Sequence, residues 1–64
     1  MKLNIRHIKK TEYHVDIEDL PGVPPIGIGR TPEEALAALL LSLVINQSWL
    51  RYIKTGNLEI MYHE

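Results

Sequence analysis

The chain has 64 residues, enough for one domain with a small hydrophobic core, and it contains no cysteine. Disulfides, thiolate metal sites and cysteine nucleophiles are therefore excluded, and a cytoplasmic protein is expected. Seven Lys and Arg residues against eight Asp and Glu residues give a formal charge of −1, which provides no overall attraction to nucleic acid. The longest apolar run, residues 35–41, is far shorter than the roughly 20 residues that span a membrane, so we expect a soluble protein without membrane contact.

Two segments with alternating side chains open the chain. Mostly apolar or aromatic residues occupy every second position, namely Leu3, Ile5 and His7, then Tyr13, Val15 and Ile17. A period of two predicts strands with one buried face. The polar residues 9–12 between them are few enough for a hairpin, so we predict two antiparallel strands.

Residues 19–25 (Asp-Leu-Pro-Gly-Val-Pro-Pro) predict an ordered loop, because prolines donate no ladder hydrogen bonds and glycine permits positive φ. Alternation resumes in Ile26-Gly27-Ile28-Gly29, which predicts a short third strand. Its glycines either thin one face of the sheet or mark a close approach of another backbone segment.

A helix is predicted to begin at Thr31-Pro32-Glu33-Glu34, where Thr31 suits the N-cap, Pro32 the first helical position and Glu34 a capping box. From residue 35 to residue 45 only Ser42 is polar, so apolar side chains surround the helix. One stripe is expected to pack on the sheet and consists of Leu36, Leu39, Leu40 and Leu43. A second stripe, formed by Ala38, Leu41 and Ile45, would face water unless something covers it.

Trp49, Leu50, Tyr52 and Ile53 return at helical spacing before Thr55-Gly56, a suitable C-cap. One helix over residues 32–55 would be about 36 Å long and overhang strands of about 23 Å, so we prefer a break near residues 46–48 and a second short helix. The alternation of Leu58, Ile60 and Tyr62 predicts a final strand. The predicted fold is one α+β domain over residues 1–64, β-β-β-α-(α)-β, whose mostly antiparallel sheet has the helix packed on one face.

The strand from Tyr13 to Ile17, the turn Asp19-Leu20-Pro21-Gly22 and the helix start Thr31-Pro32-Glu33-Glu34-Ala35-Leu36 together resemble HicB-like antitoxin domains. This resemblance covers roughly residues 1–45. It implies a reduced ribonuclease H-like sheet, a non-enzymatic role without cofactors, and a function in binding and blocking a small ribonuclease toxin. Many members of the family carry a further DNA-binding segment, whereas this chain ends shortly after its last predicted strand. The expectation is therefore a stand-alone bacterial domain of the kind that a phage or prophage encodes.

For each residue that could act in catalysis or bind a metal or an anion, a purely structural role is favoured. Asp16, Glu18 and Asp19 are close in sequence, but a metal-dependent nuclease needs oxygen ligands that converge from several elements, so a solvated strand face is favoured. The three histidines, His7, His14 and His63, lack metal-motif spacing. Residues 26–31 could cradle an anion, yet a glycine-thinned strand running into a capped helix is favoured.

Surplus apolar surface is the feature to which we assign function. A partner or dimer interface is predicted at Ala38, Leu41, Ile45, Trp49 and Tyr52, because such residues are typical of interface centres. The competing interpretation is that the second helix covers the first within one molecule. We expect a homodimeric protein-binding module of antitoxin or inhibitor type. The alternative is a nucleic-acid-binding protein that uses Lys2, Arg6, Lys9, Lys10 and Arg30, and a nuclease that depends on Asp16 is least favoured.

Overall fold

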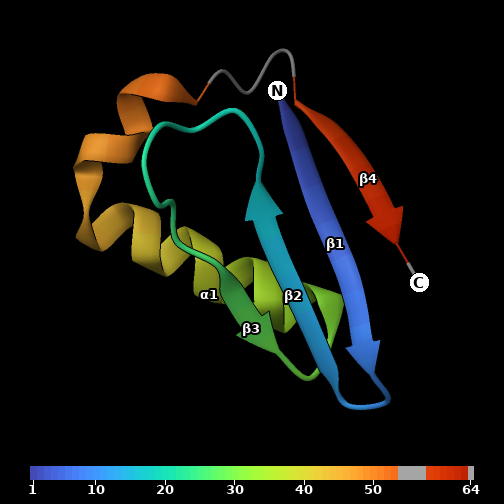
Figure 1. Ribbon diagram of the computed structural model, residues 1–64. Helices are drawn as coiled ribbons and strands as arrows, with labels where there is room; N and C mark the ends of the chain where they lie inside the picture. Colours follow the sequence, from blue (N-terminus) through green and yellow to red (C-terminus); the bar gives the residue numbers. More distant parts are fainter. Residues whose placement is uncertain (54–57, 64) are drawn as a thin grey trace.

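The structure, a computed structural model, describes residues 1–53 and 58–63. Its elements follow the order β1 (Lys2–Lys9), β2 (Glu12–Ile17), β3 (Gly27–Gly29), α1 (Pro32–Ile45), the short 3-10 helix η1 (Gln47–Tyr52) and β4 (Glu59–His63) (Figure 1). The predicted α+β class and the order β-β-β-α-β are confirmed. The predicted C-cap at Thr55-Gly56 lies outside the described residues.

The four strands form one mixed sheet in the order β3-β2-β1-β4. β1 pairs antiparallel with β2, placing Leu3 opposite Ile17, and β2 pairs antiparallel with β3. β4 runs parallel to β1, because the chain crosses from one side of the sheet to the other through α1 before it returns. The mostly antiparallel sheet of the prediction therefore contains one parallel pair.

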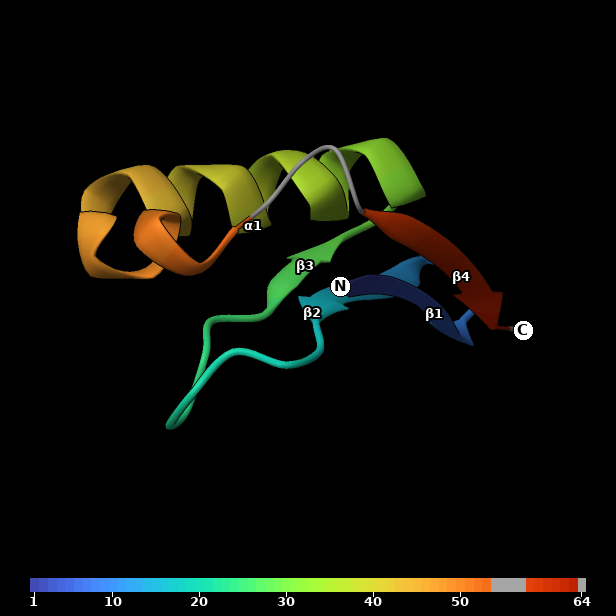
Figure 2. The same cartoon turned by 90° about the horizontal axis from the view of Figure 1, so that it is seen from above.

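α1 covers only half of one sheet face. It packs on β3 and β2, while β1 and β4 extend beyond it (Figure 2). Ile60 and Tyr62 lie on the same side of the sheet as the core residue Leu3 and its neighbour Ile5, with which they pair in register. They nevertheless remain 65% and 52% exposed. Apolar surface of the sheet is thus left open beside the helix.

The core lies between α1 and the β1–β2 pair, and its buried apolar residues are Leu3, Val15, Ile17, Ala35, Leu39 and Leu43. β3 permits the helix to approach closely because its two glycines face α1. A Cβ built on Gly27 would lie 2.0 Å from the backbone oxygen of Ala35, and one on Gly29 would lie 2.5 Å from the Ala35 nitrogen. Of the two interpretations of these glycines, the close approach of another backbone segment is confirmed.

The sheet-facing stripe of α1 differs from the prediction. Ala35, Leu39 and Leu43 are buried and Leu36 is half-buried, whereas Leu40 is 52% exposed. The prediction that Leu40 packs on the sheet was wrong. The physical reason is the glycine surface of β3, which draws the Ala35 side of the helix onto the sheet and rotates Leu40 outwards.

Local hydrogen bonds fix both ends of α1. The Thr31 hydroxyl oxygen accepts the Glu34 amide hydrogen at 3.1 Å, and the Glu34 carboxylate accepts from the backbone of Arg30 at 3.5 Å, one residue before the cap. At the other end the Asn46 amide donates to the Ser42 carbonyl at 3.0 Å, and the Asn46 side chain accepts from the Ser48 amide at 3.3 Å. The predicted break is therefore found at Asn46, where one side chain begins the next helical turn.

Candidate protein-binding surfaces

The outward side of α1 carries a continuous apolar surface. We name the exposed residues Leu40, Leu41, Val44 and Ile45 the outer helix face. Among the predicted interface residues, Leu41 is 62% exposed and Ile45 77% exposed, while Ala38 is half-buried. Within residues 1–53 and 58–63, neither η1 nor another element buries this face, because all four side chains are more than half exposed.

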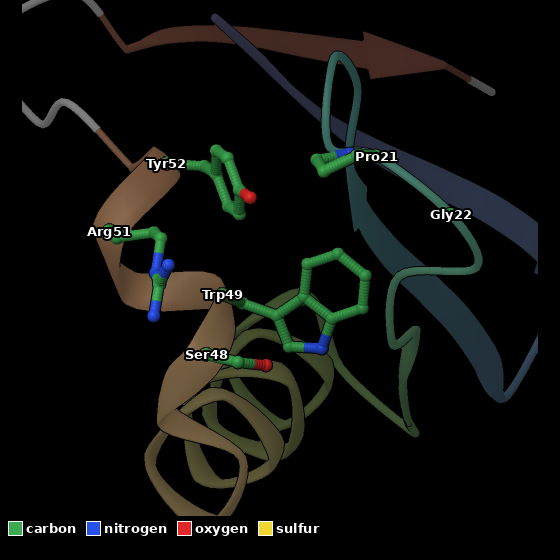
Figure 3. A pocket seen from close by; sticks show the side chains of 6 residues that line it. All are labelled: Pro21, Gly22, Ser48, Trp49, Arg51 and Tyr52. Carbon is green, nitrogen blue, oxygen red and sulfur yellow. The ribbon is translucent and has the colours of Figure 1, made fainter.

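Trp49 and Tyr52 point elsewhere, toward the loop between β2 and β3. They line an open pocket of about 360 Å³ whose other walls are Pro21, Gly22, Ser48 and Arg51 (Figure 3). Trp49 is half-buried and packs against the core, with its ring 3.7 Å from the point where a Cβ on Gly22 would lie. The five predicted interface residues thus form two groups, one on α1 and one on η1.

The loop opposite Trp49 takes its shape from two residues with left-handed backbone. Asp19 has φ 71° and Gly22 has φ 75°. Glycine adopts this conformation without penalty, and aspartate is among the few other residues that tolerate it. Leu20 between them packs against the core, which ties the turn down. The Asp-Leu-Pro-Gly sequence thereby presents Pro21 and Gly22 to the aromatic side chains of η1.

The face of the sheet opposite α1 contains a polar network that the sequence did not reveal. Asn4 is only 1% exposed, and its amide nitrogen donates to a Glu18 carboxylate oxygen at 2.9 Å. Its amide oxygen lies 2.9 Å from His63 Nε2, which donates to it. Asn4 on β1 therefore connects β4 with Glu18, the residue that follows β2. In the sequence, Asn4 occupies a polar position of an alternating strand, and such a pattern alone places its side chain in solvent.

The predicted carboxylates have separate partners. Glu18 is bound by Asn4, the nearest basic atom to Asp16 is Arg6 Nε at 4.0 Å, and Asp19 lies in the turn. One oxygen of Asp16 is buried without a hydrogen-bond partner. Within residues 1–53 and 58–63, His, Asp and Glu side chains form no group of three or more that could hold a metal ion.

The histidines also lie apart from one another. His7 stacks on Tyr13 on the helix side, with ring centroids 4.3 Å apart, and its Nε2 atom is buried without a hydrogen-bond partner. His14 lies on the other face, where its Nε2 is 2.7 Å from a Glu12 carboxylate oxygen. This hydrogen bond is the main reason why the pKa of Glu12 is lowered, with a further contribution from the charge of Lys9.

The basic residues do not gather into one patch. Lys2 and Lys9 occupy opposite ends of an eight-residue strand, and Arg30 precedes α1. Two of the predicted contacts are engaged with acids, because Lys9 Nζ lies 3.6 Å from Glu12 and Arg6 lies beside Asp16. Lys10, in the turn between β1 and β2, is exposed. In the part of the chain that the structure describes, the five predicted contact residues therefore do not form one continuous patch.

The glycine segment before α1 does not form an open anion cradle. Gly27 and Gly29 lie under the helix backbone, and the Thr31 side chain accepts the Glu34 amide at the start of the helix. This part of the chain serves the packing of β3 against α1.

Comparison with protein-family models, with curated proteins and with solved structures finds no match. The resemblance to HicB-like antitoxins thus depends on the turn and the capped helix start, and it stays a prediction. Among the described residues no helix is long and apolar enough to cross a membrane.

Proposed function

We propose that the chain is a protein-binding module of antitoxin or inhibitor type, which blocks a partner protein such as a small ribonuclease. The observation that carries this proposal is the outer helix face. Leu41 and Ile45 project from α1 into solvent although the helix has only one polar residue after its first turn. Contiguous exposed apolar surface on a small domain is typical of interaction sites.

The charges around the outer helix face suggest which partner it would accept. Glu33 and Glu34 lie in the first turn of α1, and the last turn contains no basic residue. A binding surface with an apolar centre and an acidic end suits a basic protein with an apolar groove, because charges at the rim guide association. A small basic ribonuclease, as the HicB resemblance implies, has this chemistry.

Co-expression tests the proposal directly. The chain, carrying an affinity tag, is expressed with the product of each neighbouring reading frame, and complexes are recovered and weighed by native mass spectrometry. We expect a stoichiometric complex with a small basic protein, and loss of that complex on Ile45→Ser. Ile28→Ser is the matched control, because Ile28 is also an exposed isoleucine but lies on β3.

Two results would overturn the proposal. One is a chain that forms no complex with any neighbouring product. The other is nucleic-acid binding that falls steeply with salt and is lost when Lys9 and Lys10 are replaced by alanine, which would assign the function to phosphate contacts instead.

A further inference from the structure

We propose that β4 pairs antiparallel with β4 of a second copy, in the register centred on Met61, so that one sheet runs through both molecules. This inference is independent of the proposed function, because it uses the sheet edge and leaves the outer helix face of each copy open.

The position of β4 makes it available for such pairing. It is the last strand in the described sheet, and β1 lies on one side of it only (Figure 1). The Glu59 amide donates to the Met1 carbonyl at 2.9 Å, so alternation along the strand directs the backbone groups of Ile60 away from β1. A second strand would find these groups along the outer edge.

The two edges of the sheet are protected to different degrees. Proteins commonly guard edge strands with lysine, proline, short length or a covering element. β3 has three residues, follows two prolines and is covered by α1. β4 has five exposed residues, Glu-Ile-Met-Tyr-His, with no lysine or proline among them. Among the described residues, the β4 edge therefore has no lysine, proline or covering element to prevent association.

The side chains of β4 are complementary to those of a second β4 strand that runs in the opposite direction. Antiparallel pairing about Met61 sets Glu59 opposite the partner's His63 and Ile60 opposite the partner's Tyr62, and the two-fold axis repeats both pairs. A carboxylate can accept a hydrogen bond from an imidazole that lies opposite it, and pairs of an aromatic with a β-branched residue are favourable across strands. Moving the register by two residues separates Glu59 from the partner's His63, because the partner's Met61 then lies opposite Glu59 in one direction and opposite His63 in the other. The sequence thus selects a second copy and a single register.

The same pairing covers apolar surface that α1 leaves open. Ile60 and Tyr62 lie on the same side of the sheet as Leu3 and Ile5 and are exposed. The strand that carries them, β4, lies at the edge of the sheet beyond β1 (Figure 2). In the paired register, the Ile60 and Tyr62 side chains of both copies form one strip across the two-fold axis. Burial of this strip supplies the hydrophobic contribution that a short strand ladder alone would lack.

Charge reversal on opposite positions tests both the pairing and its register. Sedimentation equilibrium is measured on the full chain, on Glu59→Lys, on His63→Glu and on an equimolar mixture of the two variants. We expect the wild type to dimerise and each variant alone to weaken dimerisation about tenfold or more, because Glu59→Lys removes the carboxylate that faces the partner's imidazole and His63→Glu sets two carboxylates opposite one another. A mixed dimer contains one copy of each variant. The substituted positions 59 and 63 then carry opposite charges and face one another, while the unchanged His63 and Glu59 form the native pair, so dimers should return.

The controls separate association from folding. Glu33→Lys makes the same charge change on α1 and should dimerise like the wild type, while circular dichroism confirms that each variant is folded. A wild type that remains monomeric at millimolar concentration would overturn the inference, and so would a mixture that associates no better than its components. Ile45→Ser should still dimerise, so failure of partner binding and failure of dimerisation are separate results.

Discussion

Gly27 shows how one residue sets the distance between the helix and the sheet. The backbone of Ala35 and Leu39 occupies the space that a side chain at position 27 would need. Gly27 also pairs with the completely buried Val15 on β2, so β3 could move away from α1 only by disturbing this pairing.

Replacement of Gly27 by alanine should therefore destabilise the domain strongly. Overpacking typically costs about 1–3 kcal/mol and more when rigid backbone is the obstacle, against a total stability of about 3–10 kcal/mol for a domain of this size. Gly22→Ala is the comparison, because its Cβ has room and the cost comes only from left-handed backbone, about 1–2 kcal/mol. Urea unfolding measures both. Equal losses of stability would contradict the close helix approach.

Glu12 provides a pH dependence whose sign follows from its hydrogen bond. Because His14 lowers the pKa of Glu12 below the ordinary value of 4.5, ionised Glu12 stabilises the folded state. This contribution is complete above pH 4.5 and is lost as the pH falls through the lowered pKa. The Glu12→Gln variant should therefore lose less stability than the wild type on acidification below about pH 4.5. Urea midpoints measured across this range check the prediction, and parallel curves for the two proteins would contradict it.

At the scale of elements, the sequence predicted what local rules determine. The alternation of β1 and β2, the capped start at Thr31 and the break at Asn46 each depend on neighbours within a few residues. The rotation of α1 about its axis could not be predicted in this way. A helix that is apolar on all sides has no polar side to show which face points away from the sheet. The burial of Asn4 and the inward direction of Trp49 depend on β4 and on the Pro21–Gly22 turn, which are distant in sequence.

Alanine substitutions of Leu39 and Leu41 test which side of α1 faces the sheet. Leu39 is fully buried and Leu41 is exposed. Leu39→Ala should cost about 2–5 kcal/mol in unfolding free energy, because it removes buried methyl groups and leaves a cavity. Leu41→Ala should change stability by no more than about 0.5 kcal/mol. Thermal and urea unfolding of both variants measure the difference, and similar losses would mean that both sides of the helix are covered.

For the whole molecule, the distribution of apolar residues is the feature on which the proposed function depends. One helix supplies three buried side chains to the core, while four large ones on its outer face remain in solvent. A 64-residue domain without disulfides has little stability to spare, so binding to a partner or to a second copy also stabilises its fold. The outer helix face and the β4 edge are separate surfaces, which allows one molecule to use both.

The most direct test of the protein-binding account is inhibition of RNA cleavage by the basic protein recovered in co-expression. The chain is titrated into a cleavage assay as the wild type, as Ile45→Ser and as Ile28→Ser. The account predicts complete inhibition by the wild type and by Ile28→Ser at equimolar ratio. Ile45→Ser should need a concentration about tenfold higher or more for the same inhibition, since truncation of a central interface residue typically costs more than about 1 kcal/mol. Equal inhibition by all three proteins, or none by the wild type, would contradict it.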